Sequence, residues 1–268
     1  MLWDTHMHTH FSGDSEALPS DMIKSAYEKG LSGICFTDHI DYDYIEPDKD
    51  LFVFDIDDYF AEMLPLAHSF KGKFPINIGV ELGLQPHVAE QNEELVTSYP
   101  FDFVIGSSHM VHGLDPYYPE YFRDRDNDTG VREYFESIIE NIKAYENFDV
   151  YGHLDYIIRY SPMKTEGYSY QKYSDVIDEI LKLLISKGKG IEINTAGYKY
   201  GLGQPNPTAD IIKRYKSLGG EIITLGADAH KPEHVAYDFD KLPALLKECG
   251  FDYFCVFKER KPSFIKLD

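Results

Sequence analysis

Short runs of apolar residues alternate along the chain with longer segments in which apolar residues recur every three or four positions. Short runs that are rich in Ile, Val and Phe and bounded by polar turns are typical of strands buried on both faces of a sheet. Eight runs of this kind predict strands, at Leu2–His6, Gly33–Asp38, Ile76–Leu82, Phe103–Ser107, Val150–His153, Gly190–Asn194, Ile222–Gly226 and Tyr253–Phe257.

The segments between these runs carry the apolar spacing of amphipathic helices. Gly30 follows the first of them, where glycine is a common signal for a helix end. The spacing predicts helices over Pro19–Lys29, Asp57–Phe70, Val131–Tyr145, Tyr173–Ser186, Thr208–Leu218 and Leu242–Cys249.

Alternation of strands and helices implies a parallel sheet with right-handed crossovers. The number of units favours a closed (β/α) barrel over an open sheet, and no GxGxxG sequence opens any helix. The long connections Ile40–Ile56 and Met110–Gly130 follow predicted strands, so we expect them on the catalytic face of the barrel. We expect residues 1–268 to form one domain.

The composition indicates which kinds of molecule the protein can bind and where in the cell it is found. The formal net charge is −20, which opposes binding to nucleic acid or anionic membranes, because both need a basic surface. Three cysteines without a CxxC pair argue against a disulfide framework and fit a reducing cytoplasm. No apolar run approaches the about 20 residues of a membrane span, and the early position of His6 leaves no room for a signal peptide. We therefore expect a cytoplasmic protein.

Histidines and acidic residues follow nearly every predicted strand, at its carboxyl end. Those ends surround one small space in a barrel, so the side chains should meet there. A single histidine is more often a surface or core residue, but chance would scatter histidines over helices and loops as well. Imidazole and carboxylate groups are ligands for zinc, manganese and iron. The candidates are His6, His8, His39, Glu81, His109, His153, Asn194, Asp228 and His230.

This number of candidates exceeds what one ion accepts. A catalytic zinc takes about four ligands and leaves one position open, so we expect two or three ions. His6 and His8 lie two apart on a strand and point to the same face. Glu81 is the natural bridging carboxylate, and two neighbouring metals suit the hydrolysis of a phosphate ester.

The order and spacing of these residues resemble the polymerase and histidinol phosphatase (PHP) superfamily. Within it, the chain length and the segment Gly152–Tyr160 are similar to the free-standing histidinol-phosphate phosphatases. The motifs that carry the resemblance are His6-x-His8-Thr9-x-x-Ser12-x-Asp14, Thr37-Asp38-His39, Glu81, Ser108-His109, Gly152-His153 and Asp228-x-His230.

The resemblance implies a distorted (β/α)7 barrel with a trinuclear metal site at the carboxyl ends of its strands. Seven units would make Tyr253–Phe257 an extra strand outside the barrel. Some members have histidine where this chain has Asp14, and an oxygen ligand there would favour iron or manganese over zinc. The implied ligand sets are His6, His8, Glu81 and Asp228 for one ion, Glu81, His109 and His153 for the second, and Asp14, His39 and His230 for the third.

The activity implied by the resemblance is hydrolysis of L-histidinol phosphate in histidine biosynthesis. A metal-bound hydroxide would attack phosphorus directly, without a phosphorylated side chain. We expect Glu81, Asp228 and Arg159 to be catalytic, with Asp228 or a metal-bound water serving the leaving group. Arg159 matches phosphate in geometry, and Lys199 and Asn194 follow the sixth strand as further substrate-binding residues.

The amine and imidazole of this substrate would need acidic or aromatic partners from the long loops. Nothing in the sequence chooses among the candidates, and His112 and His234 are further loop residues that could contact substrate. The acidic and aromatic candidates are Asp41, Tyr42, Asp43, Asp115, Tyr117 and Tyr118.

Three alternatives stay open at this stage. The first is a PHP phosphoesterase acting on another small phosphate ester or a nucleotide, although a nuclease should show a basic groove. The second is a metal-binding domain without activity, which predicts missing ligands where this chain has a full set. The third is a metal-dependent amidohydrolase, which needs a lysine at a strand end. The sequence leaves the metal and the oligomeric state open.

Overall fold

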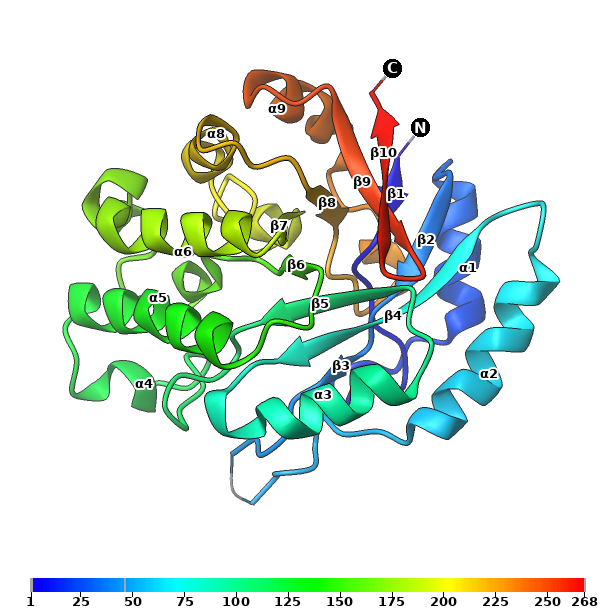
Figure 1. Ribbon diagram of the computed structural model, residues 1–268, viewed down its shortest axis with the longest axis horizontal. Coiled ribbons are helices and arrows are strands. Elements are labelled where there is room, and N and C mark those ends of the chain that lie inside the picture. The colour runs from blue at the N-terminus through cyan, green and yellow to red at the C-terminus, as the bar shows by residue number, and fades with distance from the viewer. Residues whose placement is uncertain (1, 46, 268) are drawn as a thin grey trace.

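The computed structural model describes residues 2–45 and 47–267, and a parallel sheet closed into a barrel stands at its centre (Figure 1). The strand order is β1-β2-β4-β5-β6-β7-β8, and β3 pairs with β4 beyond the end of β2. The strands are β1 (Trp3–Asp4), β2 (Gly33–Phe36), β3 (His39–Ile40), β4 (Ile76–Gly83), β5 (Phe103–Ser107), β6 (Val150–Tyr151), β7 (Gly190–Asn194) and β8 (Ile223–Gly226).

Backbone hydrogen bonds from the residues after β1 to β8 and to the segment after β8 join the two ends of this row. The Thr5 N–H donates to Leu225 O at 2.9 Å, and the His8 N–H donates to Ala229 O at 2.9 Å. Because β2 and β3 pair in succession with the same strand, they occupy one position in the barrel. The described strands therefore make a barrel of seven positions, which confirms the distorted (β/α)7 architecture.

The eighth predicted run has a different role. It forms β9 (Tyr253–Lys258), which pairs antiparallel with β10 (Lys261–Lys266) in a separate two-stranded sheet. The Phe257 ring stacks on Phe103 with centroids 5.0 Å apart, and Arg260 Nε donates to Asp149 Oδ2 at 2.7 Å. Phe103 and Asp149 lie at the amino ends of β5 and β6, so the hairpin covers that end of the barrel.

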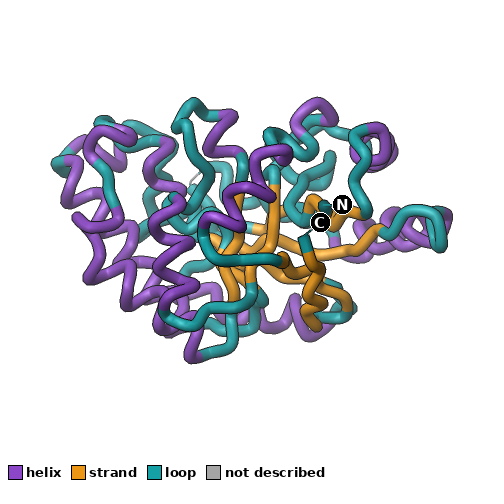
Figure 2. Tube along the Cα trace, turned by 90° about the horizontal axis from the view of Figure 1, so that it is seen from above, coloured by secondary structure: helices purple, strands orange, loops and turns teal. Residues whose placement is uncertain are grey.

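Helices surround the strands (Figure 2). Side-chain caps explain where two of them begin: Asp55 accepts from the Asp58 N–H at 3.1 Å, and Asp126 accepts from the Thr129 N–H at 2.8 Å. The α-helices are α1 (Pro19–Glu28), α2 (Ile56–Ser69), α3 (Ala89–Ser98), α4 (Glu120–Arg123), α5 (Asn127–Ala144), α6 (Ser174–Ser186), α7 (Ala196–Lys199), α8 (Ala209–Ser217) and α9 (Leu242–Glu248).

All six predicted helices are present, and α5 begins four residues before the predicted start at Val131. The apolar spacing did not predict helix α3, because its sequence is mostly polar and buries few apolar side chains. No helix among the described residues is long and apolar enough to cross a membrane. Short 3-10 helices fill the connections, at η1 (Pro86–Val88), η2 (Tyr156–Arg159), η3 (Lys164–Gly167), η4 (Tyr170–Tyr173), η5 (Pro232–His234) and η6 (Phe239–Lys241).

Candidate metal centre

The carboxyl ends of the barrel strands surround a cavity of about 340 Å³. It is lined by histidines, carboxylates and aromatic side chains from β3 and β4 and from the segments that follow β1, β3, β5, β6, β7 and β8. Every residue predicted as a metal ligand lies at this end of the barrel. The residues that line it include His8, Asp14, His39, Asp41, Tyr44, Phe52, Glu81, His109, Asp115, Tyr117, Tyr118, His153, Tyr156, Arg159, Tyr160, Tyr200, Asp228 and His230.

Glu81 stands between two pairs of histidines. Its Oε2 lies 3.0 Å from His6 Nε2 and 3.5 Å from His8 Nε2. Its Oε1 lies 2.9 Å from His153 Nε2 and 3.4 Å from His109 Nε2. The two oxygens of one buried carboxylate thus face two separate nitrogen pairs, as a carboxylate that bridges two ions requires.

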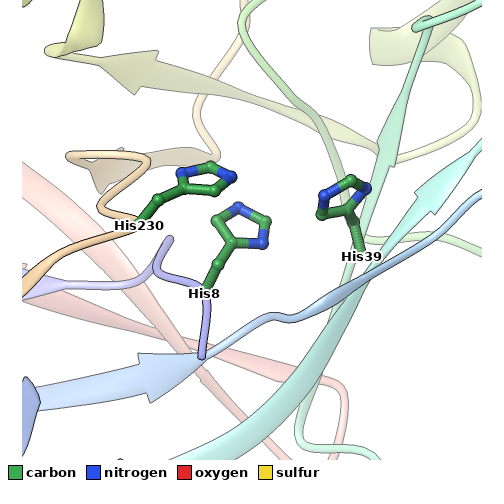
Figure 3. Close-up of side chains that lie close together, drawn as sticks. All are labelled: His8, His39 and His230. Carbon is green, nitrogen blue, oxygen red and sulfur yellow. The ribbon is translucent and has the colours of Figure 1, made fainter. Parts of the chain in front are cut away.

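Asp14 links a third group of ligands. Its Oδ1 lies 3.1 Å from His39 Nε2, and its Oδ2 lies 3.1 Å from His230 Nε2. Figure 3 shows His39 and His230 gathered around His8, and the His8 and His230 rings stack with centroids 4.1 Å apart. The three groups implied by the family resemblance therefore lie together and share one cavity.

Carboxylate partners at Nδ1 prepare three of these histidines, His6, His39 and His109, to coordinate a metal. Glu192 Oε1 lies 2.6 Å from His6 Nδ1. The two oxygens of Asp41 lie 2.9 Å from His39 Nδ1 and 2.8 Å from His109 Nδ1. An acceptor at Nδ1 holds the proton there and leaves the Nε2 lone pair for an ion.

The donor atoms fit divalent transition metals. Sets of three among them lie within 4.8 Å of one another, including His6 with His8 and Glu81, and Glu81 with His109 and His153. An ion at about 2.0–2.2 Å from each ligand holds neighbouring ligand atoms roughly 3–3.5 Å apart, close to the separations around Glu81. A mixed nitrogen and oxygen set suits zinc, iron or manganese.

The charges of the centre set the protonation of its side chains. Burial lowers the pKa of His8 to about 3. Burial acts in the same direction on His39, but hydrogen bonds with Asp14 and Asp41 outweigh it and raise the pKa of His39 to about 10. Burial alone would raise the pKa of Glu81, yet the neighbouring histidines hold it well below its ordinary value. Glu81 is therefore ionised at neutral pH, as a metal ligand must be.

Arg159 forms part of the cavity wall beside the histidines. Its Nη1 donates to Asp228 Oδ2 at 3.1 Å, and its Nη2 donates to Asn194 Oδ1 at 3.2 Å. The rings of Tyr156 and Tyr200 each have their centroid 4.9 Å from the guanidinium carbon. The guanidinium is thus held in one place with its charge close to the ligand groups.

Asn194 and Lys199 lie behind this wall. Asn194 is fully buried, its Oδ1 also accepts from the Ala196 N–H at 3.0 Å, and its Nδ2 donates to Glu192 Oε2 at 3.1 Å. Lys199 Nζ donates to the Asp228 carbonyl at 3.2 Å. Neither residue lines the described cavity, so direct contact of either with substrate stays a prediction.

Two carboxylates have roles that the sequence reading missed. Asp41, a candidate for substrate binding, is buried between His39 and His109 and orients both rings. Glu192 is not among the predicted site residues, but its place inside the buried strand β7, two positions before Asn194, is a sequence signal for such a role. Glycines make room for both carboxylates, because a Cβ atom on Gly83 would overlap Asp41 Oδ1 and one on Gly226 would overlap Glu192 Oε1.

The loop histidines do not join the site. His112 is exposed and lies 2.9 Å from Glu140 Oε2, and His234 lies in η5. Neither lines the described cavity, which argues against substrate contact by either residue. Asp43 is likewise exposed and pairs with Lys49.

Comparison with known proteins agrees with this geometry. The profile of the PHP domain family matches residues 4–196. The chain is 34% identical over 262 residues to the histidinol-phosphatase of Lactococcus lactis, which covers 96% of this chain and 95% of that protein. It is 35% identical over 250 residues to a Clostridium acetobutylicum protein named "Probable histidinol-phosphatase", with 93% and 94% covered.

The fold matches a solved relative over nearly its whole length. The crystal structure of the Lactococcus lactis histidinol phosphate phosphatase, complexed with zinc, L-histidinol and phosphate, superposes with a TM-score of 0.90. The two chains are 33% identical, and the match covers 98% of each. The family profile, these relatives and the grouped ligand residues together establish that the chain belongs to the PHP domain family.

Proposed function

We propose that this protein is a metal-dependent phosphatase that hydrolyses L-histidinol phosphate to L-histidinol and inorganic phosphate in histidine biosynthesis. The observation that carries the proposal is the position of Glu81 between two histidine pairs, with the Asp14 group and Arg159 on the same cavity. Relatives named for this activity at about one third identity support the choice of substrate.

The ligand groups would hold two or three divalent ions of zinc, iron or manganese. His6, His8, Glu81 and Asp228 would hold the first, and His109 and His153 would share Glu81 with it to hold the second. Asp14, His39 and His230 would hold the third. When bound, such ions activate water at neutral pH and offset negative charge on phosphoryl oxygens.

The chain's own residues would position the ester for this chemistry. Arg159 would pair with phosphoryl oxygens, because its guanidinium is fixed in the cavity wall and keeps its charge at any physiological pH. Asp228 holds that guanidinium and lies 3.4 Å from His8 Nε2. Burial would raise the pKa of Asp228, but His8 and other neighbours hold it well below its ordinary value, which suits a ligand better than a proton donor.

The cavity volume also favours a small ester. About 340 Å³ lies at the lower end of the usual range for small-molecule sites, and the acidic chain gives no sign of a nucleic acid substrate. Steady-state kcat/KM values for L-histidinol phosphate, a set of nucleotides and a phosphotyrosine peptide test the proposal. We expect L-histidinol phosphate to have the highest value, and a better substrate in the panel would overturn the assignment.

A further inference from the structure

The guanidinium of Arg159 has a third acceptor besides Asp228 and Asn194. Its Nε donates to Asn206 Oδ1 at 3.1 Å, and all four of these residues are buried. A guanidinium carries five N–H donors in one rigid plane. The three bonds to described residues therefore leave one N–H on Nη1 and one on Nη2 for phosphoryl oxygens. The protein acceptors decide where those two groups point.

The acceptors differ in what holds them. Asp228 Oδ1 lies 3.4 Å from His8 Nε2, so the position of this carboxylate depends on the proposed ions. The Asn206 amide instead donates from Nδ2 to Asp155 Oδ1 at 2.6 Å. One amide thus joins the Arg159 guanidinium to a carboxylate that is not among the proposed metal ligands.

Asp155 and Asn206 are both fixed by further hydrogen bonds. Asp155 is fully buried, and its Oδ2 accepts from the Thr208 N–H at 3.0 Å and from the Tyr168 phenol at 3.1 Å. The backbone of Asn206 exchanges hydrogen bonds of 2.7 and 2.9 Å with Asn194 at the end of β7. The side-chain amide is therefore anchored at both its backbone and its Nδ2 group.

The aromatic rings beside Arg159 restrict it in a different way. The guanidinium carbon lies 4.9 Å from the ring centroids of both Tyr156 and Tyr200. A ring over a guanidinium limits its tilt but leaves it free to rotate within its own plane, because the attraction acts through the ring face. Rotation in the plane is opposed by hydrogen bonds at the edge, including the bond from Nε to Asn206.

We propose that Asn206, held by Asp155, is a positioning residue that orients Arg159 so that its two remaining N–H groups bind phosphoryl oxygens. The inference rests on the proposed phosphatase function, in which Arg159 binds the phosphoryl group. Neither Asn206 nor Asp155 lines the described cavity, so each acts through the guanidinium and not on the substrate itself.

The first test measures whether the effect of Asn206 passes through Arg159. Metal-loaded wild type, Asn206→Ala, Arg159→Ala and the double variant are titrated with inorganic phosphate in a calorimeter. Losing a hydrogen bond to a charged group should raise the Kd of Asn206→Ala for phosphate about 10-fold or more. The double variant should lie within about threefold of Arg159→Ala, because a residue that acts through another has no effect once the other is absent. A similar rise in both backgrounds would overturn the proposal.

A reciprocal exchange tests the contact between Asn206 and Asp155. Asn206→Asp sets two carboxylates against each other, and Asp155→Asn leaves an amide among donors. In the double variant, the amide introduced at position 155 can donate to the carboxylate introduced at position 206, which still accepts from Arg159 Nε. Each single variant should raise the Kd for phosphate about 10-fold or more, and the double variant should return to within about threefold of the wild type. A double variant no better than the single ones would overturn the proposed contact.

Two controls distinguish positioning from general damage to the cavity. Gln204→Glu adds the same charge in the same connection, at a partly exposed residue outside the cavity lining, and should bind phosphate like the wild type. L-histidinol has no phosphoryl group, so its Kd should stay within about threefold of the wild-type value in Asn206→Ala. A loss of affinity for L-histidinol as large as that for phosphate would overturn the positioning role.

Phosphate binding also separates this inference from the proposed function. If another ester is the best substrate of the wild type but the phosphate affinity of Asn206→Ala falls only in the presence of Arg159, the proposed function fails and Asn206 keeps its role. If L-histidinol phosphate is the best substrate and Asn206→Ala binds phosphate like the wild type, the positioning role fails alone.

Discussion

Among single residues, Glu192 contacts three residues of the site, His6, His153 and Asn194, although it belongs to none of the sequence motifs. One oxygen lies 2.6 Å from His6 Nδ1, and the other accepts from the His153 N–H at 2.9 Å and from Asn194 Nδ2 at 3.1 Å. It therefore ties together a ligand of each of two proposed ions and, through Asn194, the support of Arg159. Such supporting partners of metal-bound histidines commonly matter about 10- to 100-fold for metal affinity.

Glu192→Gln should lower metal affinity about 10- to 100-fold, because an amide holds His6 less well than a carboxylate does. Chelator competition on the variant and the wild type measures the change directly. Glu179→Gln, at an exposed position on α6, is the matched control and should bind metal normally. Wild-type affinity in Glu192→Gln would show that this carboxylate does not support the metal ligands.

Arg159→Lys tests the phosphate-binding role of the guanidinium. Lysine keeps the charge but cannot span Asp228 and Asn194 or present two donors to a phosphoryl group. We expect kcat/KM to fall about 100-fold with metal content unchanged, as measured by steady-state kinetics and elemental analysis. Activity within about threefold of the wild type would exclude direct recognition by the guanidinium.

Between elements, Asp178 joins helix α6 to helix α8 and to η4. It accepts from Arg214 Nε at 2.8 Å and from the Tyr170 phenol at 2.8 Å. The hydrogen bond with Arg214 is the main cause that lowers the pKa of Asp178 to about 2, from 3.8. A carboxyl with a depressed folded pKa stabilises the fold above its unfolded pKa, and that contribution is lost as the pH falls through the folded value.

Asp178→Asn should therefore reduce the free energy of unfolding by about 1 kcal/mol at pH 7, the upper range for a pair at the protein surface. The difference from the wild type should shrink to roughly half at pH 3. Urea denaturation of both proteins at the two pH values, with chelator present throughout, provides the measurement. A difference that is the same at both pH values would mean that the ionised pair does not contribute.

At the scale of the whole molecule, the proposed ions would stabilise the folded barrel by binding ligands from several of its strands. Their ligands come from segments that follow β1, β5, β6 and β8 and from β3 and β4 themselves. A ligand that binds the folded state alone stabilises it in proportion to the logarithm of its concentration over Kd. Without metal, the carboxylates gathered at the centre of a chain of net charge −20 would also repel one another.

Chelation should therefore abolish activity and lower the melting temperature by several degrees, and added zinc or manganese should restore both. Differential scanning calorimetry with and without chelator measures the shift. A single transition in both states is expected if residues 1–268 fold as one domain. An unchanged melting temperature together with full activity would contradict the metal-dependent mechanism.

Much of the architecture could be predicted because strands and helices follow from the spacing of apolar residues within short segments. Runs such as Ile76–Leu82 and helices such as α6 show their periodicity locally, and parallel strands bring their carboxyl ends to one face wherever they occur. Helix α3 was missed and α5 was placed late because polar surface residues weaken the periodicity that such predictions use.

The sequence by itself determined the barrel and the gathering of histidines and acids at one end of it, since both follow from local pattern and strand direction. Only the tertiary structure decided that Tyr253–Phe257 covers the opposite end of the barrel and that Asp41 and Glu192 orient histidines. Those outcomes depend on contacts such as Glu192 with His6, 186 positions apart, which no local pattern of apolar and polar residues encodes.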